Sequence, residues 1–155
     1  MRARLPVALA ATFSALAFAG TASADHPGMG GTPFSATLIG ANELPGPGHP
    51  TATGTASLRL NSGQEEICGR ITTSGLGAPL AISGAHIHPG AAGQSGGVLV
   101  PLNTLVDHPT GTCVPAPRAV IKQIRKNPAN FYVNVHALPG FGPGAIRGQL
   151  ERGRG

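Results

Sequence analysis

Three of the six histidines in this 155-residue chain have a spacing that suits a metal ion. His86 and His88 flank one residue, so on a β-strand both imidazoles project from the same face, with Cβ atoms roughly 6–7 Å apart. That separation lets both rings reach one ion at ~2.0–2.1 Å. His136 offers a third imidazole from a later segment, and His108 a fourth from a loop. Neutral nitrogen ligands favour copper or zinc over calcium or magnesium.

The same histidines also have an interpretation that needs no metal. His-x-His pairs are common on exposed strand faces, where the imidazoles are simply hydrogen-bonded. A metal-binding module and a purely structural or adhesive domain therefore both fit the spacing of His86, His88 and His136. The two hypotheses differ in geometry, because ring nitrogens within about 4 Å of one another indicate a shared ion.

Arg147 is a candidate for binding a small anion. It follows a glycine- and proline-rich turn at residues 142–144 and starts the last apolar segment of the chain. Its guanidinium is always charged and offers a fork of donors, so it could guide an anion toward the histidines. Alternatively, Arg147 donates to loop carbonyls and locks the turn, and this second role is the one we favour.

The only helical pattern, at residues 117–126, has one basic and one apolar face. We expect Val120, Ile121 and Ile124 to pack on the core. Four charges without a neighbouring aromatic platform do not make a nucleic-acid site, so the basic face is expected to be solvated. Its residues are Arg118, Lys122, Arg125 and Lys126.

Several classes of enzyme lack their motifs in this chain. It contains no Gly-x-Ser-x-Gly elbow and no phosphate-binding loop ending in Gly-Lys-Ser/Thr. Among the six acidic residues, Glu65 and Glu66 are neighbours on opposite faces of an expected strand, so they cannot act together as acid and base. Hydrolase and glycosidase chemistry is therefore poorly supported, and catalysis is not favoured.

The composition predicts an all-β domain. The 24 glycines and 15 prolines interrupt any long helix, and 41% hydrophobic against 11% charged residues excludes a charge-rich disordered chain. Short alternating segments separated by turns predict an antiparallel, Greek-key-like β-sandwich of about seven or eight short strands with one short helix. Residues 103–115 are expected to be irregular and residues 137–143 to form a turn. The expected strands are residues 34–41, 52–60, 65–73, 84–88, 98–102, 131–136 and 145–151.

Strand alternation predicts which side chains share a face in the segments that carry the candidate residues. Apolar residues such as Ile87, Val135 and Ile146 are expected to face the core. The opposite face then carries His86, His88, Tyr132, Asn134, His136, Arg147 and Gln149.

The first 24 residues have the three parts of a secretory signal peptide. Arg2 and Arg4 precede an apolar run, and small residues end the segment, with cleavage expected after Ala24. The run is shorter than the ~20 residues of a membrane span and lacks a positive stop. We therefore expect a secreted or periplasmic protein with no membrane span in its mature form. It would have a flexible arm at residues 25–33, one domain at residues 34–152 and a tail at residues 153–155.

The net charge and the cysteines fit export. The formal charge of +5 includes Arg2 and Arg4, so it is weak support for nucleic-acid or membrane binding. Cys68 and Cys113 are the only two cysteines, and an even pair in an exported chain most simply forms one disulfide. Free thiols or metal ligation by the cysteines would fit a reducing compartment better.

The segments that carry these residues resemble the chordin-type (CHRD) domain. The resemblance covers residues 34–151, nearly the whole chain after the expected cleavage site. It implies a β-sandwich in an extracytoplasmic setting and implies no particular activity. The matching segments are residues 34–38, 52–56, 85–88, 98–100, 127–128, 132–136 and 144–150, together with Glu43, Gly90 and Gly93.

A more distant similarity links the chain to copper-zinc superoxide dismutases. Their Gly-x-His-x-His strand, later Val-x-His strand and arginine after a glycine turn match residues 84–88, 133–136 and 142–147 in order. By this resemblance His86, His88 and His136 would be copper ligands and Arg147 would guide an anion. The dismutase zinc loop is missing, and neither cysteine lies in the last strand, so dismutase activity is the alternative and not the leading hypothesis.

The leading hypothesis is a secreted CHRD-type binding or structural module that binds copper or zinc through its histidines. Its partner would be an extracellular protein, a small anion or a metal ion, and nucleic acid is not expected. The alternatives are a copper-dependent enzyme of dismutase type and a purely structural or adhesive extracellular domain.

Overall fold

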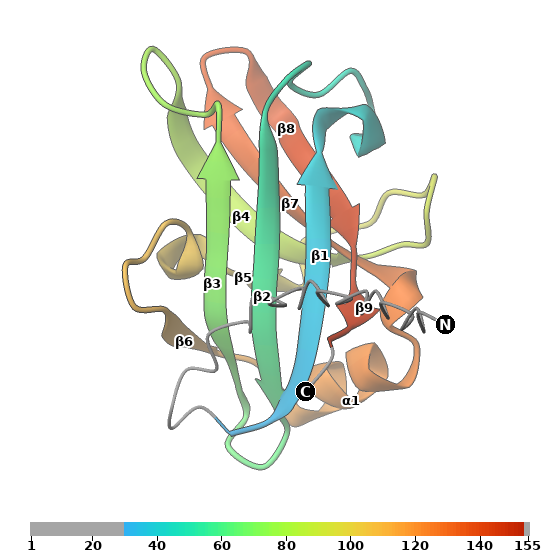
Figure 1. Ribbon diagram of the computed structural model, residues 1–155. Helices are drawn as coiled ribbons and strands as arrows, with labels where there is room; N and C mark the ends of the chain where they lie inside the picture. The colour runs from blue at the N-terminus through green and yellow to red at the C-terminus, as the bar shows by residue number, and fades with distance from the viewer. Residues whose placement is uncertain (1–29, 154–155) are drawn as a thin grey trace, which may run out of the picture.

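The computed structural model describes residues 30–153, and its first strand alternates buried and more exposed side chains. Figure 1 shows how the strands and the helix are arranged. In β1 (Thr32–Ile39), Phe34, Ala36 and Leu38 are buried, while Thr37 is exposed. The expected signal peptide lies outside the described residues, as does most of the expected arm and tail. The last two positions of the expected arm, residues 32 and 33, already belong to β1.

A tight turn joins the next two strands, as the sequence predicted. β2 (Thr53–Asn61) and β3 (Glu66–Ser74) pair antiparallel from end to end. The Asn61 side-chain oxygen accepts hydrogen bonds from the amides of Gly63 and Gln64 at 3.0 and 3.1 Å. This local bonding favours a turn over continued strand, because the side chain replaces partners that the backbone would otherwise seek.

The remaining strands complete an antiparallel sheet that curls until its two halves pack face to face (Figure 1). Its order is β5-β4-β7-β8-β1-β2-β3-β6, with β9 paired to β1. The two ends approach each other, because β5 and β6 line the same cavity of about 210 Å³. These strands are β4 (Ala81–Pro89), β5 (Val100–Pro101), β6 (Thr112–Pro115), β7 (Phe131–Leu138), β8 (Phe141–Gln149) and β9 (Glu151–Arg152).

The all-β, sandwich-like class is confirmed, but the strands differ in number and length from the prediction. The described residues hold nine strands. β6 lies in the segment expected to be irregular, and β8 begins at Phe141 inside the expected turn. The last expected strand, residues 145–151, is divided between β8 and β9. β6 and β9 have only four and two residues. Strands of this length depend on pairing with a neighbouring strand, so their own sequence shows no recognisable alternation.

The predicted disulfide is confirmed and lies between two paired strands. Cys68 of β3 stands directly opposite Cys113 of β6, and the two sulfurs are bonded. Cys68 is fully buried. The bond joins positions 45 residues apart and so ties the edge strand β6 to the sheet.

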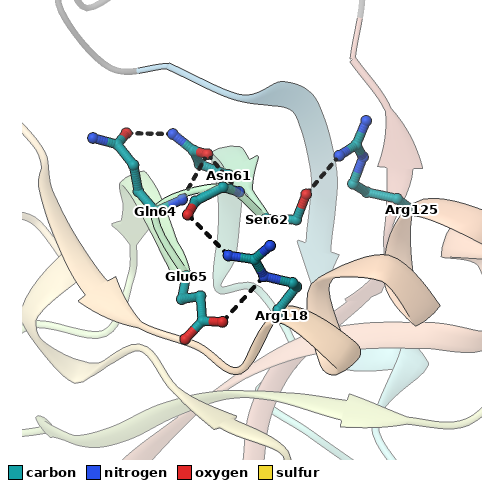
Figure 2. A network of polar contacts seen from close by, with 7 residues as sticks. Asn61, Ser62, Gln64, Glu65, Arg118 and Arg125 are labelled. Atoms are coloured by element: carbon teal, nitrogen blue, oxygen red, sulfur yellow. Dashed lines mark hydrogen bonds and ion pairs between the residues drawn. The ribbon is translucent and has the colours of Figure 1, made fainter.

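The basic face of the helix α1 (Arg118–Lys126) is partly used to hold the helix in place (Figure 2). Arg118 forms an ion pair with Glu65 at 3.2 Å and also donates to the Gly63 carbonyl. Arg125 donates to the Ser62 hydroxyl at 3.1 Å. Arg118 is exposed, as expected, and both arginines in addition fasten α1 to the β2–β3 turn. Within residues 30–153, no helix is long and apolar enough to cross a membrane.

We expect the apolar face of α1, and not its ion pair, to carry the stability of this contact. Ile121 is fully buried, so Ile121→Ala should lower the free energy of unfolding by about 2–4 kcal/mol. Arg118→Ala should cost less than about 1 kcal/mol, because both partners of its ion pair are more than half exposed. Urea denaturation of the two variants checks this, and an equal loss in both would contradict it.

Candidate metal centre

Three neighbouring strands bring the predicted polar side chains onto one face of the sheet. The register places His86 of β4 beside Asn134 of β7, and Asn134 beside Arg147 of β8. The next row holds His88, Tyr132 and Gln149. The side chains on the other face of these strands, such as Ile87, Val135 and Ile146, are fully buried in the core. The predicted alternation is therefore confirmed in all three strands.

The structure brings His86, His88 and His136 together. Nδ1 of His86 lies 3.1 Å from Nε2 of His136. One ligand nitrogen from each of the three rings lies within 4.8 Å of the other two. His88 is buried, and the other two rings are half-buried. Three imidazoles from two adjacent strands thus converge at the surface of the sheet.

Backbone carbonyls fix two of the three rings. His136 donates from Nδ1 to the Gly142 carbonyl at 2.8 Å, and His88 donates from Nδ1 to the Gly96 carbonyl at 2.9 Å. A carbonyl only accepts, so the proton of each ring lies on Nδ1 and the metal-binding position of each neutral ring is Nε2. Carbonyl partners of this kind set the tautomer and orientation of metal-binding histidines.

The surroundings favour neutral imidazoles. Burial, together with repulsion from the neighbouring rings of His136 and His88, lowers the pKa of His86 below its usual 6.5. Burial also lowers the pKa of His136, against an opposing effect of its bond to Gly142. Because only neutral imidazole binds a metal, these shifts leave both rings ready to act as ligands at neutral pH.

His108, the fourth candidate, lies elsewhere in the fold. Its neighbour Asp107 accepts hydrogen bonds from the amide and hydroxyl of Thr73, which ties this loop to β3. The metal-ligand group found among the described residues around His86 does not include His108. The structure therefore brings together three of the four histidines named from the sequence.

A glycine-rich loop at residues 90–99 covers this polar face, and Arg147 holds it there. The guanidinium donates from Nη2 to the Ala91 and Gln94 carbonyls and lies 3.4 Å from the centre of the Tyr132 ring. Tyr132 in turn stacks on His88, with the rings 4.9 Å apart and nearly parallel. Arg147 is only 1% exposed. Arg147 therefore donates to loop carbonyls, which is the second of the two roles considered from the sequence. These carbonyls belong to the loop after β4, whereas the sequence predicted that Arg147 would lock the turn before β8.

A cavity of about 430 Å³ lies on the other side of Arg147. Besides Arg147, its walls include Ala41, Asn42 and Leu44 and, from the covering loop, Ala92 and Gly93. Near it, Glu43 is 4% exposed, and its Oε1 has no hydrogen-bond partner among the described residues. A Cβ at Gly144 would collide with the Glu43 carboxylate, so the missing side chain at this position leaves room for the buried acid. Glu43 lies outside the strands expected from the sequence, and its burial was not predicted because the contact with Gly144 joins distant segments.

Glu43 should make the protein less stable as the pH rises. Burial raises its pKa from 4.5 to about 7, against opposing effects of Arg147 and the Leu44 amide. Between pH 4.5 and 7 the folded state therefore holds a proton that the unfolded state releases, and stability falls across this range. Glu43→Gln should remove this part of the pH dependence in urea denaturation from pH 4 to 8. Identical slopes in both proteins would contradict the assignment.

Two contacts of the site were not predicted. Asn134 was placed on the correct face but given no role, and its amide oxygen lies 3.0 Å from Nε2 of His88. The Gly96 carbonyl comes from a loop whose path the sequence does not specify. The sequence held one indication of a role for Asn134, namely that it lies two residues before His136 and so on the same strand face.

Comparison with known proteins gives one match. The family described as the CHRD domain matches residues 34–150, which is most of the chain. No curated protein and no solved structure matches the chain.

Proposed function

The chain belongs to the CHRD-domain family, and from that premise we propose that it binds one transition-metal ion, copper by preference, through His86, His88 and His136. The observation that carries this proposal is the 3.1 Å separation of His86 Nδ1 and His136 Nε2, with a nitrogen of His88 within 4.8 Å of both. The proposed setting is extracytoplasmic, which agrees with the family and with the Cys68–Cys113 disulfide.

The 3.1 Å separation of His86 and His136 meets the separation of about 4 Å expected for a shared ion, and the nitrogen of His88 lies within 4.8 Å of both. Two nitrogens 3.1 Å apart, each at ~2.0–2.1 Å from an ion, form an angle of about 100° at that ion. This angle lies between those of square-planar and tetrahedral coordination, which copper and zinc adopt. The nitrogen of His88, which lies within 4.8 Å of the other two, has to move inward to join them, and a rotation of the side chain can supply this shift.

The donor set supports copper or zinc over harder ions. All three candidate donors are imidazole nitrogens, and no acidic residue belongs to this group within the described part of the chain. Calcium and magnesium prefer oxygen ligands, so they are poor candidates. In affinity for nitrogen sites Cu(II) exceeds Zn(II), which is the reason for placing copper first.

Metal binding should shift the ring proton of His86 from Nδ1 to Nε2. The 3.1 Å contact between His86 and His136 is a hydrogen bond, so one of the two nitrogens carries a hydrogen. The ring proton of His136 lies on Nδ1, from which it donates to the Gly142 carbonyl, so Nε2 of His136 accepts and Nδ1 of His86 donates. An ion bound to both nitrogens replaces this hydrogen. His86 can then keep a proton only on its other nitrogen.

Titration of the purified, metal-free protein with Cu(II) and with Zn(II) tests the proposal. We expect one ion per chain, tighter binding of Cu(II), and nitrogen coordination in the electron paramagnetic resonance spectrum of the copper form. Binding no tighter than that of a protein with His86, His88 and His136 all changed to alanine would overturn it.

A further inference from the structure

We propose that Asn134 gates the metal centre: its amide occupies Nε2 of His88, and an incoming ion has to displace it. This inference deepens the proposed metal function and rests on it. It starts from a difference among the three histidines. His86 and His136 contact each other, whereas the metal-binding nitrogen of His88 contacts another residue's side chain.

The two nitrogens of His88 are both engaged. Nδ1 lies 2.9 Å from the Gly96 carbonyl, and Nε2 lies 3.0 Å from the amide oxygen of Asn134. Since a carbonyl only accepts, Nδ1 carries a proton, and Nε2 is the only position left for a metal. With the amide oxygen toward it, Nε2 also carries a proton; with the amide turned, the NH2 group donates to its lone pair. In both arrangements Asn134 fills the ligand position.

The packing keeps Asn134 in this position. Asn134 lies in β7, the strand between β4 and β8, with His86 and Arg147 as its register partners. Its side chain is 4% exposed. His88 is 6% exposed and is held from its other side by the Tyr132 ring. Neither side chain can reach bulk water as a replacement partner without moving. Breaking their contact therefore weakens the binding of any ion that uses all three imidazoles.

The gate predicts an order of binding. An ion first meets His86 and His136, whose nitrogens are already 3.1 Å apart and linked only to each other. His88 joins when Asn134 turns away. The wild-type site is thus a two-imidazole site at first contact and a three-imidazole site once the amide is displaced.

Asn134→Leu tests the gate, because leucine keeps a similar size but cannot hydrogen-bond. We expect Cu(II) affinity to rise about fivefold, the effect of removing one competing hydrogen bond. The matched control is Asn42→Leu, which removes an amide that donates to the Arg147 carbonyl on β8 and not to one of the three histidines. It should leave the affinity unchanged. If the wild type binds Cu(II) and Asn134→Leu binds it no more tightly, the gate is overturned and the proposed metal site stands.

A second measurement needs no metal. In nitrogen-15 spectra of the metal-free protein, the signal of His88 Nε2 should shift in Asn134→Leu, while that of His136 Nδ1 should stay in place. An unshifted His88 signal would overturn the gate even if Cu(II) still binds. Failure of both the wild type and Asn134→Leu to bind Cu(II) would overturn the proposed function together with the gate.

Discussion

His86→Ala and His136→Ala are each expected to weaken Cu(II) binding by at least about 100-fold. Either change removes one of the two nitrogens that lie 3.1 Å apart and leaves no close pair. Loss of a residue that only orients a ligand already costs 10–100-fold, so loss of a ligand should cost at least the upper end of that range. Competition against a chelator of known affinity measures the change.

The control for this experiment is His108→Ala. His108 lies outside the group of three, in a loop tied to β3 through Asp107 and Thr73. It should bind Cu(II) as the wild type does. If His108→Ala loses affinity while His86→Ala keeps it, the site is not where we place it. Thermal denaturation of each variant separates loss of ligand from loss of fold.

Removing the disulfide should have the largest effect on stability among the changes considered. The double variant Cys68→Ala/Cys113→Ala should lose about 3–4 kcal/mol of unfolding free energy, because the bond closes a loop between positions 45 residues apart. The effect acts mainly through the unfolded chain, whose freedom the bond restricts. Urea denaturation without reductant measures it against the wild type.

Reduction gives an independent check of the disulfide. Wild-type protein unfolded with reductant present should lose about as much stability as the double variant does. The variant itself should not respond to reductant, because the chain has no other cysteine. A difference of less than about 1 kcal/mol in unfolding free energy between oxidised wild type and the double variant would contradict this prediction. It would show that hydrogen bonds to β3, and not the disulfide, hold β6.

The long strands were predictable because burial imposes a two-residue period on them. In β4 and β7 the alternation of Ile87 or Val135 with histidine settles which side chains face outward. The short strands β5, β6 and β9 span two to four residues, too few for a period to be recognised. Their place depends on partners that lie far away in the chain, such as Cys68 for Cys113.

The sequence by itself determined the kinds of donor available, the pairing of His86 with His88 on one strand face, and the single disulfide. It could not determine which other side chains meet those histidines. The convergence of His136, the amide of Asn134 on His88 and the burial of Glu43 against Gly144 all depend on how β4, β7, β8 and the loops come together. Local pattern sets the face on which a residue lies, whereas strand order and loop path, fixed by the whole core, set its neighbours.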